Sequence, residues 1–186
     1  TAYMSTDSYH VGTRMPDGRP VLVIDSGSVG NLGGDRWAKT VAQKAAQNGK
    51  TASYEKRERP LNVSGVGKGD DKAPYDCHLP VAFQRFLEDA KKASSVNGSL
   101  RIPTVSNSDL PGLLGLLALI NNWAVIDYNK MMVYFLGPGE YDLEKGMSAG
   151  TERLQAERSP SGHMVLPAKT TVNGLIVPLL GRGQPR

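Results

Sequence analysis

The sequence predicts a mainly β fold with one or two short helices. Glycine and proline account for 21 and 12 of the 186 residues, a combined share of about 18% against an average of roughly 12%. This excess favours many turns, and therefore short strands over long helices. The candidate strands are short runs rich in β-branched residues and bounded by Gly, Pro, Asn and Asp. The clearest helical spacing is confined to residues 36–47.

Length and charge limit the classes of function. A chain of 186 residues is one domain, or one domain with an extension. The net charge is +4, and the basic and acidic residues are mostly interleaved, which does not suggest a nucleic-acid interface. The single cysteine, Cys77, excludes an intrachain disulfide.

No stretch carries a clear membrane signal. The uncharged run 110–126 falls just short of a membrane span and is broken by Pro111, Gly112 and Gly115, so it is interpreted as a buried core segment. The N-terminus is polar and has no signal-peptide pattern. We expect a soluble protein and favour an intracellular one, although the sequence does not name a compartment.

The first elements form a hairpin that leads to an acidic residue. The sequence predicts a strand over residues 8–14, a turn containing Pro and Gly over 15–19, and the returning strand over 20–24. The strand ends on the motif Asp25-Ser26-Gly27-Ser28. A carboxylate at the end of a buried strand is costly unless it is solvated or used. The motif by itself also fits an ordinary Asp-Ser-Gly turn.

A helix is predicted after the glycine-rich loop. Asp35 is the expected N-cap, and Gly49 a plausible stop. Trp37, Val41 and Ala45 fall on one helical face.

The strand, glycine loop and helix also resemble a dinucleotide-binding turn. However, Gly27, Gly30 and Gly33 have G-x-x-G-x-x-G spacing instead of G-x-G-x-x-G, and no further strand–helix alternation follows. This alternative is therefore weak.

Residues 61–69 and 75–83 predict a second hairpin, with a tip rich in glycine and charge. The tip is either an ordinary surface turn or a flap that closes over a bound chain. Residues 84–99 are expected to form a short helix or an insertion loop. Residues 100–105 are a further strand.

The last part of the predicted domain is a strand, a helix and a hairpin. Residues 109–119 indicate a buried strand that ends at Gly115 and leads into a short helix. Residues 124–135 predict a closing hairpin with a turn at Asn129-Lys130. Beyond it, 162–167 and 171–180 have strand-like patterns.

The histidines do not predict a metal centre. His10 and His163 stand alone, and the adjacent pair Cys77-His78 has no partner pair at ligand spacing. We expect no metal and no cofactor.

Four features in this order resemble the retropepsin-like aspartic proteases of retroviral and retrotransposon polyproteins, and are most similar to the Copia type. They are Asp25-Ser26-Gly27-Ser28 after an apolar strand, the glycine-rich 63–67 segment, Leu113-Leu114-Gly115, and the hairpin with its Ile126-Asp127 step. The resemblance implies a closed β-barrel of the acid protease fold over residues 1–136. Residues 137–186 are then a C-terminal extension that is partly strand-forming.

The resemblance also implies roles for individual residues. The catalytic motif is Asp25, Ser26 and Gly27; the substrate-binding flap contains Val63, Ser64, Gly65, Val66 and Gly67; the segment that supports the site is Leu113, Leu114 and Gly115. Aspartic proteases need two carboxylates that share a proton around one water. This chain has one D-[ST]-G motif, so activity requires a homodimer and a polypeptide substrate.

The sequence leaves a second function open. A retropepsin-derived domain without proteolytic activity could serve as an accessory subunit of a larger assembly through residues 137–186. Three departures from the family pattern bear on this alternative: Leu116 follows Gly115, a helix follows the catalytic loop, and the flap tip is charged.

Overall fold

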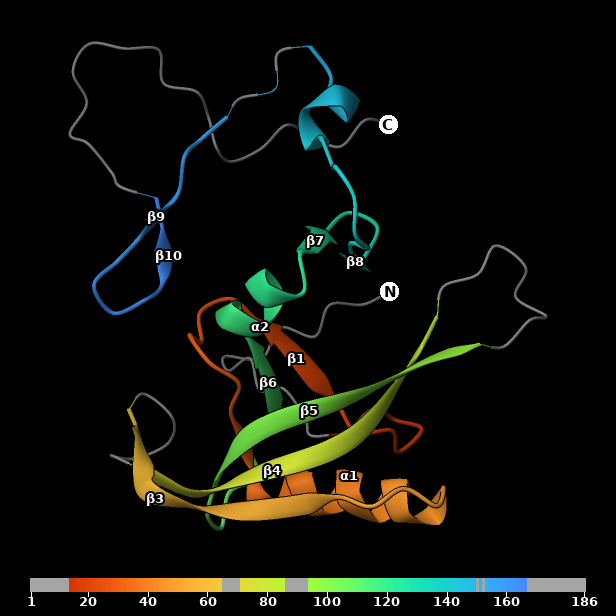
Figure 1. Cartoon of the computed structure of the whole chain (residues 1–186), viewed down its shortest axis with the longest axis vertical. Coiled ribbons are helices and arrows are strands. Elements are labelled where there is room, and N and C mark those ends of the chain that lie inside the picture. The colour runs from red at the N-terminus through yellow and green to blue at the C-terminus, as the bar shows by residue number, and fades with distance from the viewer. Residues whose placement is uncertain (1–13, 65–70, 86–93, 150, 152, 167–186) are drawn as a thin grey trace.

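The computed structural model describes residues 14–64, 71–85, 94–149, 151 and 153–166 (Figure 1). Strands predominate over helices, so the predicted mainly β class is confirmed. Several predicted features lie outside the described residues: His10 and the strand at 8–13, the flap residues 65–70, residues 86–93 of the expected insertion, and the segment 171–180.

The first turn forms as predicted. Arg14 bridges Pro20, the amide of Met15 donates to the carbonyl of Arg19 at 2.7 Å, and Gly18 has φ +80°. The turn leads into strand β1, Leu22–Asp25.

A four-stranded sheet has the order β2-β5-β4-β3. The strands are β2 (Gly33–Gly34), β3 (Ser53–Val63), β4 (Asp71–Gln84) and β5 (Ser95–Val105). Strand β2 pairs with β5 in parallel, whereas β3–β4 and β4–β5 are antiparallel. The predicted β3–β4 hairpin is therefore present, although its strands are longer than expected.

The expectation of a helix or loop over 84–99 is wrong for the residues at its end. Ser95–Ser99 continue strand β5 and pair with Pro80–Gln84 across the sheet. Their polar composition does not indicate a strand. The pairing partner, which lies more than ten residues away in the chain, decides the conformation instead.

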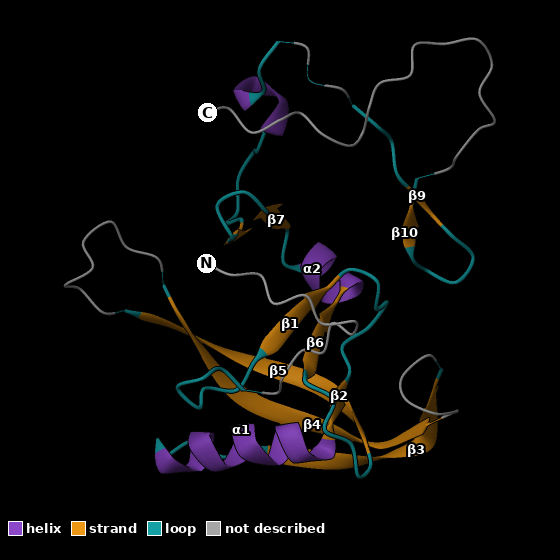
Figure 2. Ribbon diagram, turned by 180° about the vertical axis from the view of Figure 1, so that it is seen from behind, coloured by secondary structure: helices purple, strands orange, loops and turns teal. Residues whose placement is uncertain are grey.

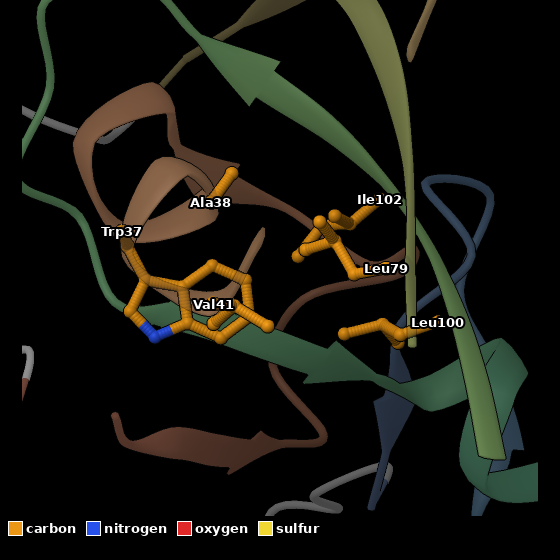
Figure 3. Close-up of a cluster of buried hydrophobic side chains, with 6 residues drawn as sticks. All are labelled: Trp37, Ala38, Val41, Leu79, Leu100 and Ile102. Carbon is orange, nitrogen blue, oxygen red and sulfur yellow. The ribbon is translucent and has the colours of Figure 1, made fainter. Parts of the chain in front are cut away.

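Helix α1 (Asp35–Gln47) packs on the sheet with Trp37, Val41 and Ala45 buried, as its spacing predicts. Ala38 is buried beside Trp37 and Val41 (Figure 3). Its predicted N-cap is wrong by one residue. Gly34 is the N-cap, and the Asp35 carboxylate instead accepts a hydrogen bond from the amide of Ser108 at 3.1 Å. Asn48 is the C-cap, followed by Gly49 at φ +68°.

A second, two-stranded sheet lies over the first (Figure 2). Strand β1 pairs in parallel with β6 (Gly112–Gly115), and helix α2 (Leu116–Asn121) follows. The predicted closing hairpin is β7 (Ala124–Asp127) with β8 (Met132–Phe135), and the Asp127 carboxylate accepts hydrogen bonds from the amides of Asn129 and Lys130 in its turn.

The core consists of two clusters of buried side chains. The larger cluster joins α1 to β4 and β5 and comprises Trp37, Ala38, Val41, Leu79, Leu100 and Ile102 (Figure 3). The smaller cluster comprises Leu32, Val63, Ala73 and Val105. Leu114 of β6 packs against the larger cluster and Leu113 against the smaller, so β6 links the two.

The chain after helix α2 is thinly packed. It contains a 3-10 helix, Leu143–Gly146, and a short hairpin of β9 (Glu157–Arg158) and β10 (Met164–Val165). Beyond Leu119, no described residue is fully buried. Among the helices that the structure describes, none has the length and apolar character needed to cross a bilayer.

Candidate active site

The loop that follows β1 wraps around the end of β6. On one side of β6, Asp25 pairs with Gly115 in the parallel register. On the other side, Leu32 exchanges backbone hydrogen bonds with Leu113, at 2.6 and 3.3 Å. Residues 26–31 therefore pass over Gly115. This arrangement brings together the Asp-Ser-Gly motif and the Leu-Leu-Gly segment, which are about ninety residues apart in the sequence.

Gly115 is required by this crossing. A Cβ atom at Gly115 would lie 2.2 Å from the carbonyl oxygen of Gly30 and 2.9 Å from that of Ser28. No side chain fits there without moving the backbone of the loop. Next to this contact, the amide of Leu116 donates to the carbonyl of Ser28 at 2.8 Å, and that of Leu117 to the carbonyl of Val29 at 3.0 Å.

Asn31 holds the far end of the loop. Its Oδ1 accepts a hydrogen bond from the amide of Gly115 at 3.0 Å, and its Nδ2 donates to the carbonyl of Arg101 at 3.0 Å. The side chain therefore ties the loop to both β6 and β5. Sequence reasoning missed this residue. The only available signal was an amide side chain inside a glycine-rich loop, and such residues are common in turns.

The Asp25 carboxylate is half-buried and fixed on one side. Its Oδ1 accepts hydrogen bonds from the amides of Gly27 at 2.9 Å and Ser28 at 3.2 Å. Gly27 lies close enough that a Cβ there would be 3.1 Å from the same oxygen. Within the described part of the chain no donor reaches Oδ2, and Ser26 makes no side-chain hydrogen bond. Among the described residues, Oδ2 is thus left for a water or a second acid.

The predicted flap residues have different environments. Val63 is 7% exposed and belongs to the smaller core cluster, where it packs with Leu32 at the end of the Asp25 loop. Ser64 is exposed. Gly65, Val66 and Gly67 lie outside the described residues. The side chain of Val63 thus anchors the hairpin to the core of the domain.

The dinucleotide-binding alternative does not fit the geometry at helix α1. The amide of Gly34 donates to the carbonyl of Leu110 at 2.9 Å, and that of Arg36 to the carbonyl of Ser108 at 3.4 Å. The Asp35 carboxylate adds negative charge in the first turn. A phosphate at this helix N-terminus would need the same amides and would be repelled by that charge. The glycines here permit close packing: a Cβ at Gly34 would lie 2.2 Å from the Ser108 carbonyl oxygen.

Cys77 and His78 do not form a ligand pair. Adjacent residues of a strand point to opposite faces of the sheet. Cys77 packs against the larger core cluster, and its Sγ lies 3.7 Å from Oγ1 of Thr104. Burial raises the pKa of this thiol. Within the described ranges, no three His, Cys, Asp or Glu side chains gather as metal ligands would.

The chain was compared with protein-family models, with curated proteins and with solved structures. None of the three comparisons found a match. Function is therefore inferred from the residues around Asp25 and from the resemblance of their sequence motifs.

Proposed function

We propose that the protein is a retropepsin-like aspartic endopeptidase that acts as a homodimer on extended polypeptides. The observation that carries this proposal is the crossing of the Asp25 loop over Gly115, with Asp25 and Gly115 in register. This crossing gives a physical reason for two of the four family-like motifs, which are about ninety residues apart in the sequence, to occur together. The closed barrel of the acid protease fold is part of the proposal, supported by β1, β6 and the large sheet around a shared core.

The proposed peptide hydrolysis needs two carboxylates, of which each chain supplies one, Asp25. In an aspartic protease one carboxylate takes a proton from a water, while the other, protonated, donates to the substrate carbonyl oxygen. Attack of the water gives a tetrahedral intermediate, which breaks its C–N bond as the leaving nitrogen is protonated. Asp25 supplies one carboxylate, with Oδ1 held by two amides and Oδ2 open. The second must come from the Asp25 of another copy.

The substrate is expected to bind in an extended conformation. The β3–β4 hairpin rises from the core beside the Asp25 loop, because Val63 at its end packs with Leu32. A polypeptide between the hairpin and the loop can pair its main chain as an added strand. This mode of binding selects an unfolded or flexible segment over a folded surface.

An uncovered apolar surface supports a second copy as the partner. It comprises the exposed side chains of helix α2 and of the segment that follows it: Leu117, Ile120, Trp123, Tyr128, Met131, Tyr134 and Phe135. Strands β7 and β8 form only a two-stranded sheet, and neither has a fully buried residue. Such a hairpin is marginal on its own, and an apolar patch of this kind marks an interface. Helix α2, which carries Leu117 and Ile120, is bonded to the Asp25 loop through the amides of Leu116 and Leu117, so a second copy bound over this helix would lie beside that loop.

The test is cleavage of unstructured peptides by the purified chain at mildly acid pH. We expect cleavage that a general aspartic-protease inhibitor stops. Asp25→Asn should lower kcat/KM by at least about a hundredfold, since it removes a general acid–base group. Asp109→Asn is the matched control, because Asp109 is an exposed partner of Arg36.

A catalytically silent accessory subunit is the alternative that the same apolar surface supports. It predicts that the chain binds a different protein and leaves peptides intact. Cleavage that persists in Asp25→Asn, or a well-formed dimer that cleaves nothing, would contradict the protease proposal.

A further inference from the structure

The turn of the C-terminal hairpin lies against the Asp25 loop. A Cβ atom at Gly162 would be 3.2 and 3.3 Å from the two methyl carbons of Val29, which follows Asp25 by four residues. Both views place the turn between β9 and β10 beside the loop that joins β1 to β2 (Figures 1 and 2). The extension therefore returns to the candidate site.

The turn has a defined shape of its own. The amide of Ser159 donates to the carbonyl of His163 at 2.9 Å, and the amide of Gly162 to the carbonyl of Ser159 at 2.9 Å. The amide of His163 donates to Oγ of Ser159 at 3.1 Å, and Oγ of Ser161 lies 2.9 Å from Nδ1 of His163. Gly162 has φ +90°, which most residues with a side chain adopt only under strain. Because these hydrogen bonds fix its conformation, the turn can restrain the loop that it contacts.

Val29 is consequently held from two sides. Its carbonyl accepts the amide of Leu117, the second residue of helix α2. Its side chain faces Gly162 on the tail turn. Valine is stiff at χ1, so pressure on its methyl groups is passed to the backbone of the loop.

We propose that the tail turn, residues 159–163, is a positioning element for Asp25, so that the C-terminal extension belongs to the active site. This inference rests on the proposed protease function. The turn touches the loop and acts on Asp25 through it. Its loss lets the loop shift, and a displacement of about 1 Å at a reacting group can cost on the order of a hundredfold in rate. The effect is expected mainly on kcat, because the group that is displaced is the reacting carboxylate of Asp25.

The test replaces Gly162 by Asn. Asparagine tolerates positive φ better than most residues, so Gly162→Asn adds a side chain against Val29 with limited backbone strain. We expect kcat to fall roughly tenfold, with KM and the dimer unchanged. Gly18→Asn is the control: Gly18 has φ +80°, close to that of Gly162, and has no atom within 4 Å of an added Cβ. It should behave like the wild type.

A rescue variant separates positioning from simple damage to the turn. Val29→Ala removes the two methyl carbons that an added side chain at Gly162 would meet. In the Gly162→Asn background it should restore much of kcat, a non-additive effect that requires direct contact. Amide hydrogen exchange of residues 26–31 supplies a readout that needs no activity: it should speed up in Gly162→Asn and slow again in the double variant.

Two results overturn the inference. If kcat and loop exchange in Gly162→Asn equal those of the wild type, the turn does not position the loop. If kcat rises, the turn restrains the site instead of supporting it. A wild-type protein without Asp25-dependent cleavage would refute the protease proposal, and the exchange comparison would still decide whether the turn holds the loop.

Discussion

Glycines at four positions allow backbones to approach closely, and their lack of a side chain shapes the site. A Cβ at Gly112 would lie 2.4 Å from the ring of Trp37, whose Nε1 donates to the carbonyl of Val21 at 2.7 Å. Gly33, Gly34 and Gly115 are likewise enclosed by neighbouring atoms. In the sequence, Gly33 belongs to the spacing that resembles a dinucleotide-binding turn, Gly34 to a glycine-rich loop, and Gly112 and Gly115 to the uncharged run 110–126. Only the neighbouring atoms reveal that each admits another backbone or an indole ring.

Asp76 is a buried acid that stabilises the sheet. It is 4% exposed and accepts hydrogen bonds from Arg57 at 2.5 Å and from Arg101 at 2.7 and 3.2 Å. Burial by itself would raise the pKa of Asp76, but the bonds from Arg101 and Arg57 outweigh it and hold the pKa below the ordinary value of 3.8. Because the folded pKa is lower than the unfolded one, the stabilisation is full above the ordinary value and is lost as pH falls through the folded pKa.

The lowered pKa of Asp76 predicts how the stability of the protein changes in acid. Asp76→Asn should lower the free energy of unfolding by about 1–3 kcal/mol at neutral pH, since it leaves the two guanidinium groups without their anion. The difference in unfolding free energy between variant and wild type should begin to shrink as pH falls below the ordinary value of 3.8, and should close as pH passes the lowered pKa of folded Asp76. Urea unfolding at several pH values measures the loss of stability at neutral pH and its dependence on pH.

Asp109→Asn is the matched control for Asp76→Asn. Its pair with Arg36 is well exposed, and such a pair contributes less than about 1 kcal/mol. If the difference in unfolding free energy between Asp76→Asn and the wild type stays constant down to pH 3, the ionised Asp76 carboxylate is not what stabilises the sheet.

At the scale of elements, the long strands β3 and β4 carry the hairpin that the proposal interprets as a flap. Residues 55–59 of β3 are charged and mostly exposed, yet the strand pairs with β4 through Ser53–Lys56. The pairing shifts between Lys56 and Leu61 and then resumes as far as Val63. The buried Val63 holds this end of the hairpin to the core.

Burial of Val63 predicts an effect on stability. Val63→Ala should lower the free energy of unfolding by roughly 1–3 kcal/mol through the lost packing with Leu32, Ala73 and Val105. Its KM for peptide should change little. Ser64→Ala, the exposed neighbour, should stay within about 0.5 kcal/mol of the wild type. Unfolding measurements together with steady-state kinetics distinguish a role of Val63 in core packing from a role in substrate binding. A raised KM with unchanged stability would assign Val63 to substrate binding.

Local patterns predict most of these elements. The spacing of Trp37, Val41 and Ala45 predicts helix α1, and the apolar run that ends at Gly115 predicts β6, because both depend on side chains close together in the chain. The extension of β5 back to Ser95 and the N-cap at Gly34 do not follow from local pattern. Both depend on partners many residues away, strand β4 and the segment at Ser108.

At the scale of the whole molecule, the chain divides into a packed part and an uncovered part. The fully buried residues lie between Leu32 and Leu119, whereas the described segment after Leu119 has none. That segment nevertheless carries large apolar side chains, among them Trp123 at 69% exposed and Met131 at 84%. Such a surface is costly in water and favours association.

The proposed association through β7 and β8 makes a testable prediction. Phe135 is 54% exposed, and Phe135→Lys should weaken the dimer by at least about tenfold, because it places a charge in an apolar interface. Phe83→Lys is the control, since Phe83 is 45% exposed on β4 of the other sheet. Sedimentation velocity over a series of protein concentrations measures both. A Phe135→Lys dimer as tight as the wild type would place the interface elsewhere.

The sequence by itself determined the mainly β class, helix α1, and the strands that carry Asp25 and Leu113-Leu114-Gly115, since the period of apolar residues and the turn residues between them are local properties. The tertiary structure decided how the parts meet. The carbonyl of Ser108 accepts a hydrogen bond at the N-terminus of helix α1, and Val63 packs in the core. The side chain of Asn31 bonds the amide of Gly115, and Gly162 lies next to Val29. These contacts link residues far apart in the chain, and their energy comes from burial and hydrogen bonding between partners that no local pattern identifies.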